Sequence, residues 1–222
     1  MMKKTTLFSL LVPAALLVGC HERSAVNGLT VEMLDCPLGV AAEHPRLSWR
    51  IESALPATVQ TGYRILVSTD PGDLETGENL IWDSGDVPSD RSVLVPYEGP
   101  ELESRRDYYW KVRVATNHGD TLWSEPSRWS MALLDDSDWQ ARWIGYDSCL
   151  NRTDTLGVFS RLAARYLRKE FDAGRDIAQA RLYISGLGLY ECYLNGCRVG
   201  EDVLAPTATD YTKTVCYNVY DV

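Results

Sequence analysis

Carboxylates are the side chains of this sequence best suited to acid–base chemistry. Seven of them lie in or beside predicted loops and strands: Glu98, Glu101, Glu103, Asp107, Glu170, Glu191 and Asp210. Such chemistry needs one group that donates a proton and another that accepts one, both within reach of a bound substrate. Nothing in the spacing places two of them across a cleft, and carboxylates on an acidic protein are normally solvated. We therefore predict no catalytic residue in this chain.

Thiols are the second reactive set. The chain has six cysteines. Apart from Cys20, they are Cys36, Cys149, Cys192, Cys197 and Cys216. This remainder is odd, so at least one thiol stays unpaired within a monomer.

An Asn195-Gly196 turn sets the register around two of these thiols. Asn-Gly between apolar runs is a strong hairpin signal, because both turn residues must adopt positive φ. It predicts three cross-strand pairs: Leu194 with Cys197, Tyr193 with Arg198 and Cys192 with Val199. Cys192 and Cys197 are then diagonal neighbours about 7–8 Å apart, which is too far for a disulfide. We predict that both are reduced and pack as small apolar residues on a buried face.

No metal site or cofactor is expected. His21, His44 and His118 are scattered, and the cysteine spacing does not suit zinc. The run from Asp135 to Asp138 lacks the alternating ligands, the glycine and the terminal Glu of an EF-hand. We expect a solvated interdomain loop there. Neither a metal ion nor a cofactor is predicted for this chain.

The first twenty residues are typical of an export signal. Lys3 and Lys4 precede an apolar run from Leu7 to Val18 that is too short to span a bilayer. The closing Leu17-Val18-Gly19-Cys20 resembles the bacterial lipoprotein signal, in which Cys20 becomes the acylated N-terminus after cleavage. The alternative is an ordinary secretory signal cleaved nearby. Several acyl chains on one residue anchor a protein stably, so we expect attachment to the membrane through Cys20, in the cell envelope, on the periplasmic or cell-surface face of the outer membrane.

Charge excludes one class of partner. The formal charge is −9, and removal of Lys3 and Lys4 lowers it to −11. An acidic chain with no basic patch repels phosphate backbones, so nucleic acid is not an expected partner. The seven Trp and twelve Tyr suit sugar-facing surfaces and sandwich cores alike, and the core interpretation is favoured.

Alternating apolar residues predict a first β-sandwich. The runs are Leu47, Trp49 and Ile51; Tyr63, Ile65 and Val67; Val93, Val95 and Tyr97; and Trp110, Val112 and Val114. A period of two between turn residues indicates half-buried antiparallel strands, and about seven such strands are typical of an immunoglobulin-like sandwich. Turns are expected at 70–73, 83–86 and 117–120. Residues 21–45 read as irregular, and no amphipathic helix is expected in this region.

Sequence features also indicate where the first predicted sandwich ends and where the next domain begins. The stretch from Tyr108 to Asn117, followed by Trp123 to Ser127, resembles the last two strands of a fibronectin type III domain. Trp139 and Trp143 are expected to fill the seam between two domains. The apolar residues within 162–171 fit either the period of a helix or that of a strand, and this pattern alone favours a helix.

Seven segments in order resemble the N-terminal part of bacterial α-L-rhamnosidases of glycoside hydrolase family seventy-eight. They are 45–49, 63–67, 82–85, 109–114, 139–145, 165–171 and 183–196. The resemblance runs from about residue 29 to the last residue. It implies that Arg165 to Phe171 is the first strand of a jelly-roll-like domain. This expectation replaces the helix that the apolar pattern alone favours.

The resemblance implies an all-β chain with two sandwiches, the second incomplete. The expected organisation is a signal peptide at 1–20, a tether at 21–28, a fibronectin type III-like sandwich at 29–134, a linker at 135–145 and a truncated rhamnosidase N-terminal β-sandwich at 146–222. Enzymes of the family remove terminal α-L-rhamnose from plant glycosides and pectic glycans with inversion. They carry their catalytic carboxylates in a helical barrel that follows these domains and is missing here.

Two functions remain open. In the favoured one the chain is the accessory N-terminal region of a lipid-anchored α-L-rhamnosidase, inactive alone, with the missing barrel and rhamnose-containing glycans as possible partners. In the alternative it is a free-standing surface module that binds glycan or protein through its sandwich faces.

Overall fold

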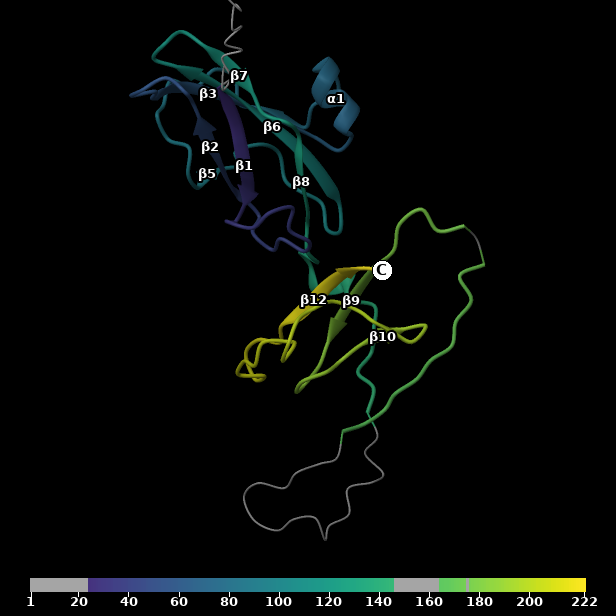
Figure 1. Ribbon diagram of the computed structural model, residues 1–222. Coiled ribbons are helices and arrows are strands. Elements are labelled where there is room, and N and C mark those ends of the chain that lie inside the picture. The colour runs from purple at the N-terminus through teal and green to yellow at the C-terminus, as the bar shows by residue number, and fades with distance from the viewer. Residues whose placement is uncertain (1–23, 146–163, 175) are drawn as a thin grey trace, which may run out of the picture.

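The computed structural model describes residues 24–145, 164–174 and 176–222. The export signal, Cys20 and Cys149 therefore lie outside the described residues. Within the described ranges the chain is antiparallel β-sheet with one six-residue α-helix, so the predicted all-β class is confirmed. Figure 1 shows two groups of strands, β1 to β8 in one and β9 to β12 in the other.

The first group is a two-sheet sandwich, here called the first unit. One sheet has the order β1-β2-β5, formed by β1 (Ala25–Val31), β2 (Arg46–Glu52) and β5 (Val95–Pro96). The other has the order β4-β3-β6-β7, formed by β4 (Trp82–Asp83), β3 (Gln60–Ser68), β6 (Asp107–Thr116) and β7 (Thr121–Trp123), with β8 (Ser127–Ser130) also paired to β6. Two antiparallel sheets with this order of pairing form an immunoglobulin-like sandwich.

The core between the two sheets comes from the alternation seen in the sequence. In β6 the side chains of Trp110, Val112 and Val114 are fully buried, because successive residues of a strand point to opposite faces. Trp49 and Trp129 join them from β2 and β8. Trp and Tyr therefore serve mainly as core residues in this unit, as expected.

The prediction that residues 21–45 are irregular is wrong for Ala25–Val31. This segment forms β1 and pairs with β2. Its buried residues are Val26, Leu29 and Val31, and the register shifts between Asn27 and Thr30. Gly28 lies in that shift with a φ of +58°. The bulge breaks the period of two, and this is why the alternation was not visible in the sequence.

The turn expected at residues 70–73 is the start of a helix, α1 (Pro71–Thr76). The Asp70 side chain accepts a 2.7 Å hydrogen bond from the Gly72 N–H and caps the helix. Pro71 fits the first turn, and Gly77 ends the helix with a φ of +74°. The helix has six residues and buries only Leu74. It is therefore too short to show a helical period of apolar residues in the sequence.

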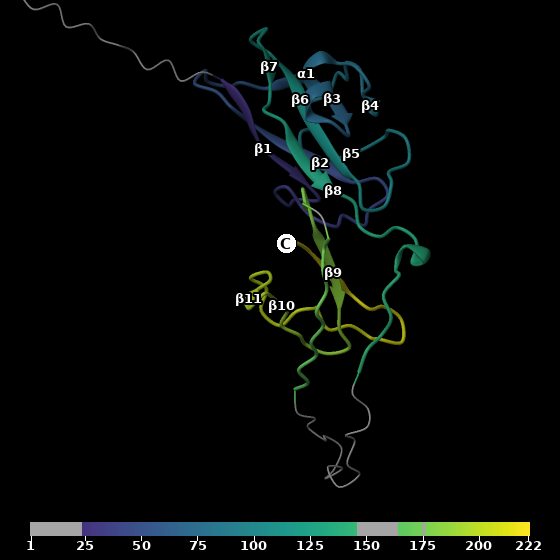
Figure 2. The same ribbon diagram turned by 90° about the vertical axis from the view of Figure 1, so that its right-hand side faces the viewer.

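The second group is small and is here called the second unit. Its longest pair is β9 (Arg181–Ser185) with β12 (Tyr217–Asp221). A hairpin joins β10 (Tyr193–Leu194) to β11 (Cys197–Arg198) in the predicted register. Between the two units, η1 (Asp136–Asp138) is a single 3-10 turn capped by Asp135. Figure 2 shows β9 in the same lower part of the molecule as β10 and β11, apart from the first unit.

Two expectations for the second unit are corrected. Cys192 and Cys197 are both free thiols, as predicted, but Cys197 is exposed and not part of a core. The described residues 164–171 form neither helix nor strand. Tyr166 is 99% exposed and Phe171 is 71% exposed. A strand forms only where a neighbour accepts its backbone hydrogen bonds, and no such partner lies beside this segment in the described ranges.

In the three stretches that the structure describes, no helix combines the length and the apolar character needed to cross a membrane.

Candidate interdomain site

The two units meet at a junction built around Tyr217 of β12. The Leu133 N–H donates a 2.9 Å hydrogen bond to the Tyr217 hydroxyl oxygen. The ring of Trp139 lies 5.6 Å from the ring of Tyr217, centroid to centroid. Trp139 therefore contacts the seam as predicted. Trp143 is 60% exposed, so the prediction that it also fills the seam is wrong.

An ion pair crosses the same junction. An Arg181 guanidinium nitrogen in β9 lies 2.5 Å from an Asp107 carboxylate oxygen in β6, and the two side chains are 10% and 21% exposed. The Gln179 amide nitrogen donates a 3.3 Å hydrogen bond to the other Asp107 oxygen. Burial opposes the charge on Arg181 and is the largest single influence, but the hydrogen bond to Asp107, the charge of Asp107 and the neighbouring Tyr183 together outweigh it, so the pKa of Arg181 is raised.

Close backbone packing adds to these polar contacts. Gly39 of the first unit has a φ of +75°, and a Cβ built on it would lie 2.7 Å from Cγ2 of Val219 in β12. Any other residue would meet both the strain of the left-handed region and this neighbour. Glycine at position 39 is therefore what lets the two units approach.

Buried polar atoms remain on the second-unit side. Arg181 Nε and the Tyr183 hydroxyl are buried without a hydrogen-bond partner among the described residues. The guanidinium carbon of Arg105 lies 5.9 Å from the centre of the Tyr183 ring, a distance at which a cation interacts with a ring face. The junction is thus polar as well as aromatic.

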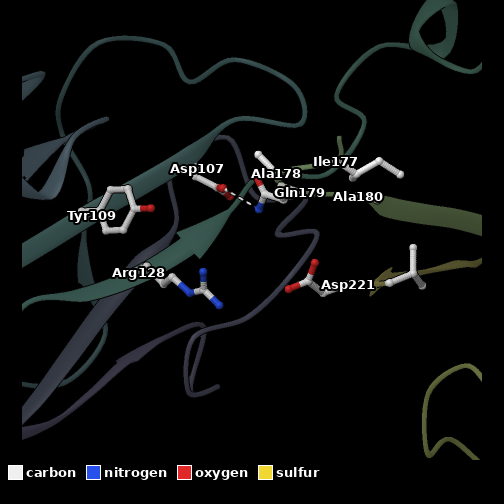
Figure 3. Close-up of a pocket in the computed structure, with 9 residues that line it drawn as sticks. Asp107, Tyr109, Arg128, Ile177, Ala178, Gln179, Ala180 and Asp221 are labelled. Atoms are coloured by element: carbon white, nitrogen blue, oxygen red, sulfur yellow. Dashed lines mark hydrogen bonds between the residues drawn. The ribbon is translucent and has the colours of Figure 1, made fainter. Parts of the chain in front are cut away.

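A cavity of about 480 Å³ opens beside the ion pair. It is lined by Asp107, Tyr109, Arg128, Ile177, Ala178, Gln179, Ala180, Asp221 and Val222. In Figure 3 the only hydrogen bond drawn among these residues joins Asp107 to Gln179. The Arg128 guanidinium and the Asp221 carboxylate face each other across the open space with no bond drawn between them. Residues of both units therefore line one shallow, open and largely polar depression.

The seven carboxylates considered as acid–base candidates are dispersed over the structure, and only Asp107 lies at the junction. Glu103 pairs with Arg106, Glu170 with Arg168 and Asp210 with Lys213, while Glu191 accepts a hydrogen bond from the Tyr193 hydroxyl. Glu98 and Glu101 are exposed. Asp107 is not a solvated surface carboxylate but part of the junction.

Asp221 is a lining carboxylate that the sequence analysis did not single out. It pairs opposite Arg181 in the β9–β12 ladder. This pairing brings it to the same cavity as Asp107. Since both Asp107 oxygens are engaged by Arg181 and Gln179, the two aspartates do not form an available acid–base pair. Only the long-range strand pairing identifies this site, and no local motif reports it.

The residues that the structure describes contain no cluster of three or more His, Cys, Asp or Glu side chains able to hold a metal ion. The acidic run at 135–138 caps η1 instead. Hydrogen bonding from the Ser137 side chain, and then from the Ser137 backbone N–H at 2.7 Å, lowers the pKa of the Asp135 carboxyl.

Two family models match different parts of the chain. Residues 26–135 match the Rha78A-like N-terminal immunoglobulin domain, and residues 175–222 match the α-L-rhamnosidase N-terminal domain. The first match covers the first unit, and the second covers β9 to β12. Both matches agree with the architecture seen in Figure 1.

Curated relatives and solved structures agree with these matches. The chain is 33% identical to an α-L-rhamnosidase of Formosa agariphila over 97% of this chain and 25% of that protein. It is 35% identical to one of Streptomyces avermitilis over 88% of this chain and 20% of that protein. The structure of the α-L-rhamnosidase from Dictyoglumus thermophilum superposes with a TM-score of 0.78 at 34% identity, over 89% of this chain and 23% of that one. The native enzyme from Aspergillus terreus gives 0.67 at 28% identity, over 89% and 22%. The chain thus spans a quarter or less of each of these proteins.

Proposed function

Because this chain corresponds to the N-terminal portion of the α-L-rhamnosidases, we propose that it is the accessory region of such an enzyme, anchored to a membrane by lipid on Cys20. The complete enzyme would remove terminal α-L-rhamnose from plant glycosides or pectic glycans with inversion. The observation that carries the proposal is the order of the two matches, an immunoglobulin domain at 26–135 and a rhamnosidase N-terminal domain at 175–222.

The role proposed for this portion is positioning. The contacts of Tyr217, the Arg181–Asp107 pair and the Gly39–Val219 packing all join the first unit to the second. A junction of this kind holds two domains in one orientation, and so it can present whatever follows at a constant distance from the membrane anchor. If the contacts between two domains are few or weak, the domains are expected to move relative to each other.

The chemistry of the complete enzyme would need groups that the described residues of this portion do not supply. Inverting hydrolysis uses a general acid and a general base about 6.5–9.5 Å apart, with room for a water molecule between the base and the sugar. Asp107 is engaged on both oxygens, and Glu103, Glu170 and Asp210 have cationic partners of their own. We therefore propose no catalytic role for the described carboxylates.

The activity test uses the full 222-residue chain, purified in mild detergent, with an aryl α-L-rhamnoside as substrate. We expect no release of the aryl group above the blank. Release that disappears in the Asp221→Asn or Asp107→Asn variant would show that the chain carries its own catalytic pair, and the accessory role would be wrong.

The anchor has a separate test. The full chain is expressed in a bacterial host supplied with labelled palmitate, and membrane and soluble fractions are compared. We expect label and protein in the membrane fraction for the wild type, and loss of both for Cys20→Ser. Cys36→Ser is the matched control, since Cys36 is exposed on the first unit, and it should behave as the wild type. Unlabelled, soluble wild-type protein would favour an ordinary secretory signal.

A second candidate function is a free-standing module that binds glycan. The junction cavity favours it, because polar side chains from both units converge on one shallow, open depression. Binding without hydrolysis by the full chain would support this function. It is compatible with the accessory role, since an accessory domain can also bind the substrate of its enzyme.

A further inference from the structure

The loop that follows β2, residues 53–59, exposes apolar side chains and carries no charge. Its sequence is Ser-Ala-Leu-Pro-Ala-Thr-Val. Leu55 is 47% exposed and Val59 is 51% exposed. The exposed residues of the loop are Ala54, Leu55, Pro56, Ala57 and Val59. They form one apolar surface on the first unit, here called the 53–59 loop surface.

The backbone groups behind the two largest of these side chains have partners within the protein. At Leu55 the N–H donates to Ser53 Oγ at 3.2 Å, and the carbonyl accepts from the Thr58 hydroxyl at 2.8 Å. At Val59 the N–H donates to Asn117 Oδ1 at 2.9 Å, and the carbonyl accepts from the Asn117 N–H at 3.0 Å. A polar group that leaves water without a partner costs free energy. Leu55 and Val59 can therefore enter an apolar medium without leaving a backbone group unpaired.

Asn117, in the turn after β6, also holds the loop in one shape. Its Nδ2 donates a 3.1 Å hydrogen bond to the Ala57 carbonyl, in addition to its two bonds with Val59. A surface that is already ordered pays less conformational entropy when it binds. The apolar side chains are thus presented by a loop that does not need to fold on contact.

The loop lies at the end of the first unit where the chain arrives from Cys20. Ala25, the first residue of β1, pairs with Glu52 at the end of β2. The Ser24 hydroxyl lies 2.8 Å from the Ser53 hydroxyl. Three residues separate Cys20 from Ser24, so their Cα atoms are at most about 14 Å apart. A lipid on Cys20 would therefore bring the 53–59 loop surface close to a bilayer.

The second unit lies at the opposite end of the first. Figure 1 shows the arrowhead of β1 pointing toward β9 and β12, and β1 begins at the far end. The contacts of Gly39 with Val219 and of Leu133 with Tyr217 join the units at the end that β1 points to. The 53–59 loop surface thus faces away from the second unit.

We propose that the 53–59 loop surface rests on a lipid bilayer, with Leu55 and Val59 at the boundary between headgroups and acyl chains. The proposal rests on the proposed function for the lipid on Cys20. It goes beyond that function by assigning a second, non-covalent membrane contact, which directs the second unit away from the membrane. Interfacial binding grows with the apolar area buried, and a few small side chains bury little, so the loop acts together with the anchor.

Charge indicates which kind of bilayer suits this contact. The loop has no basic residue to attract anionic headgroups, and the chain has a formal charge of −9. Anionic lipids attract basic segments and repel acidic ones. The test therefore uses a bilayer of zwitterionic phosphatidylcholine.

The test is photochemical cross-linking of the acylated full chain in phosphatidylcholine vesicles that contain a diazirine group in one acyl chain. The chain comes from the preparation with labelled palmitate, so that its acylation is known. Mass spectrometry of peptides locates the cross-links. We expect them in the peptide that contains residues 53–59, and none in the peptide that contains Val203, which is 78% exposed in the second unit.

Leu55→Asp replaces an apolar contact with a charge. It should lower cross-linking of the 53–59 peptide about tenfold, because the apolar burial of one leucine is lost, and should leave the palmitate label unchanged. Val203→Asp is the matched control and should cross-link as the wild type does. Both residues are exposed, so circular dichroism should show wild-type folding for both variants.

Three results would overturn the proposal while the anchor stands. They are a labelled chain without cross-links in residues 53–59, as expected if the loop contacts a protein instead, equal cross-linking of the Val203 peptide, and undiminished cross-linking in Leu55→Asp. A wild-type chain without palmitate label would overturn the anchor and this proposal together. The label therefore tells the two failures apart.

Discussion

The backbone N–H of Leu133 donates a 2.9 Å hydrogen bond to the hydroxyl oxygen of Tyr217, a residue 84 positions later in the chain. Leu133 follows β8 at the end of the first unit, and Tyr217 begins β12 in the second. The Tyr217 ring also lies 6.3 Å from that of Tyr183 in β9, centroid to centroid. Burial raises the pKa of Tyr217, so its hydroxyl stays neutral at physiological pH. One side chain thus links the two units and braces the strand pair beside them.

Tyr217→Phe should lower the free energy of unfolding by about 1 kcal/mol, because the Leu133 N–H loses its acceptor while the ring is kept. Urea denaturation followed by fluorescence measures the change. Tyr166→Phe is the control, since Tyr166 is 99% exposed, and it should leave the urea midpoint unchanged. Equal effects of the two substitutions would mean that the junction bond contributes nothing specific.

Arg181→Ala should lower the free energy of unfolding by about 2 kcal/mol, because it leaves the largely buried Asp107 carboxylate without its charged partner. The matched control is Arg168→Ala. Arg168 pairs with Glu170, but both side chains are at least 80% exposed, and exposed pairs contribute little. Urea denaturation of both variants gives the comparison. A double-mutant cycle with Asp107→Asn should show coupling at this pair, and additive effects would contradict it.

Thiol reactivity should follow exposure. Cys36 and Cys197 are exposed, whereas Cys192 and Cys216 are half-buried. Without reductant, iodoacetamide should therefore modify Cys36 and Cys197 of the native protein first, and all four after unfolding in urea. Mass spectrometry of peptides from timed samples follows each site. Finding Cys192 and Cys197 resistant to labelling in the unfolded chain would indicate a disulfide between them and a different hairpin register.

Alkaline pH should destabilise the first unit through Tyr97. Burial raises the pKa of Tyr97 to about 12, above the value of about 10 for an unfolded chain. Since the folded-state pKa is the higher one, the neutral hydroxyl contributes its full stability below about pH 10 and loses it as the pH rises toward 12. Tyr97→Phe removes the titrating group. It also removes the 2.9 Å bond from the hydroxyl to the Pro100 carbonyl, a loss of about 1 kcal/mol at neutral pH.

The check on Tyr97 is the pH dependence of the urea midpoint. The wild type should lose stability more steeply than Tyr97→Phe between about pH 10 and about pH 12. Parallel slopes for the two proteins would mean that Tyr97 does not titrate on unfolding.

Trp129→Ala should be the most damaging of these substitutions. Trp129 is 1% exposed, and its ring stacks on that of Tyr108 at a centroid distance of 5.3 Å. Removing a buried aromatic ring leaves a cavity and typically lowers the free energy of unfolding by about 3–5 kcal/mol. Trp143→Ala, which changes a tryptophan that is 60% exposed, should have no measurable effect in the same denaturation experiment. Equal losses would place Trp143 in a packed interface.

Local signals in the sequence predicted local structure well. The Asn195-Gly196 turn gave the correct register of β10 and β11, because a two-residue turn determines which residues face each other. The alternation in β2, β3 and β6 gave the sandwich and its core. Where local geometry departed from the ideal period, prediction failed, as at the Gly28 bulge in β1 and at the six residues of α1.

The junction could not be predicted in the same way. Asp107 and Arg181 are 74 residues apart, and nothing in either neighbourhood reports the other. The sequence pattern predicts a solvated carboxylate at Asp107 and marks nothing at Asp221. Both became recognisable only when the β9–β12 pairing placed them on one surface. The candidate site is thus a product of tertiary structure, whereas the fold class is already visible in strand patterns.

The contact between Gly39 and Val219 has a consequence for how such proteins can be recombined. Position 39 is encoded near the start of the first unit, yet the side chain that leaves no room for a Cβ there belongs to β12. A chimaera that takes the immunoglobulin domain from one relative and the following domain from another must therefore match these two positions. Exchange of both units together preserves the match without further changes. The two domains together, and not either one alone, are therefore the unit to transfer between relatives.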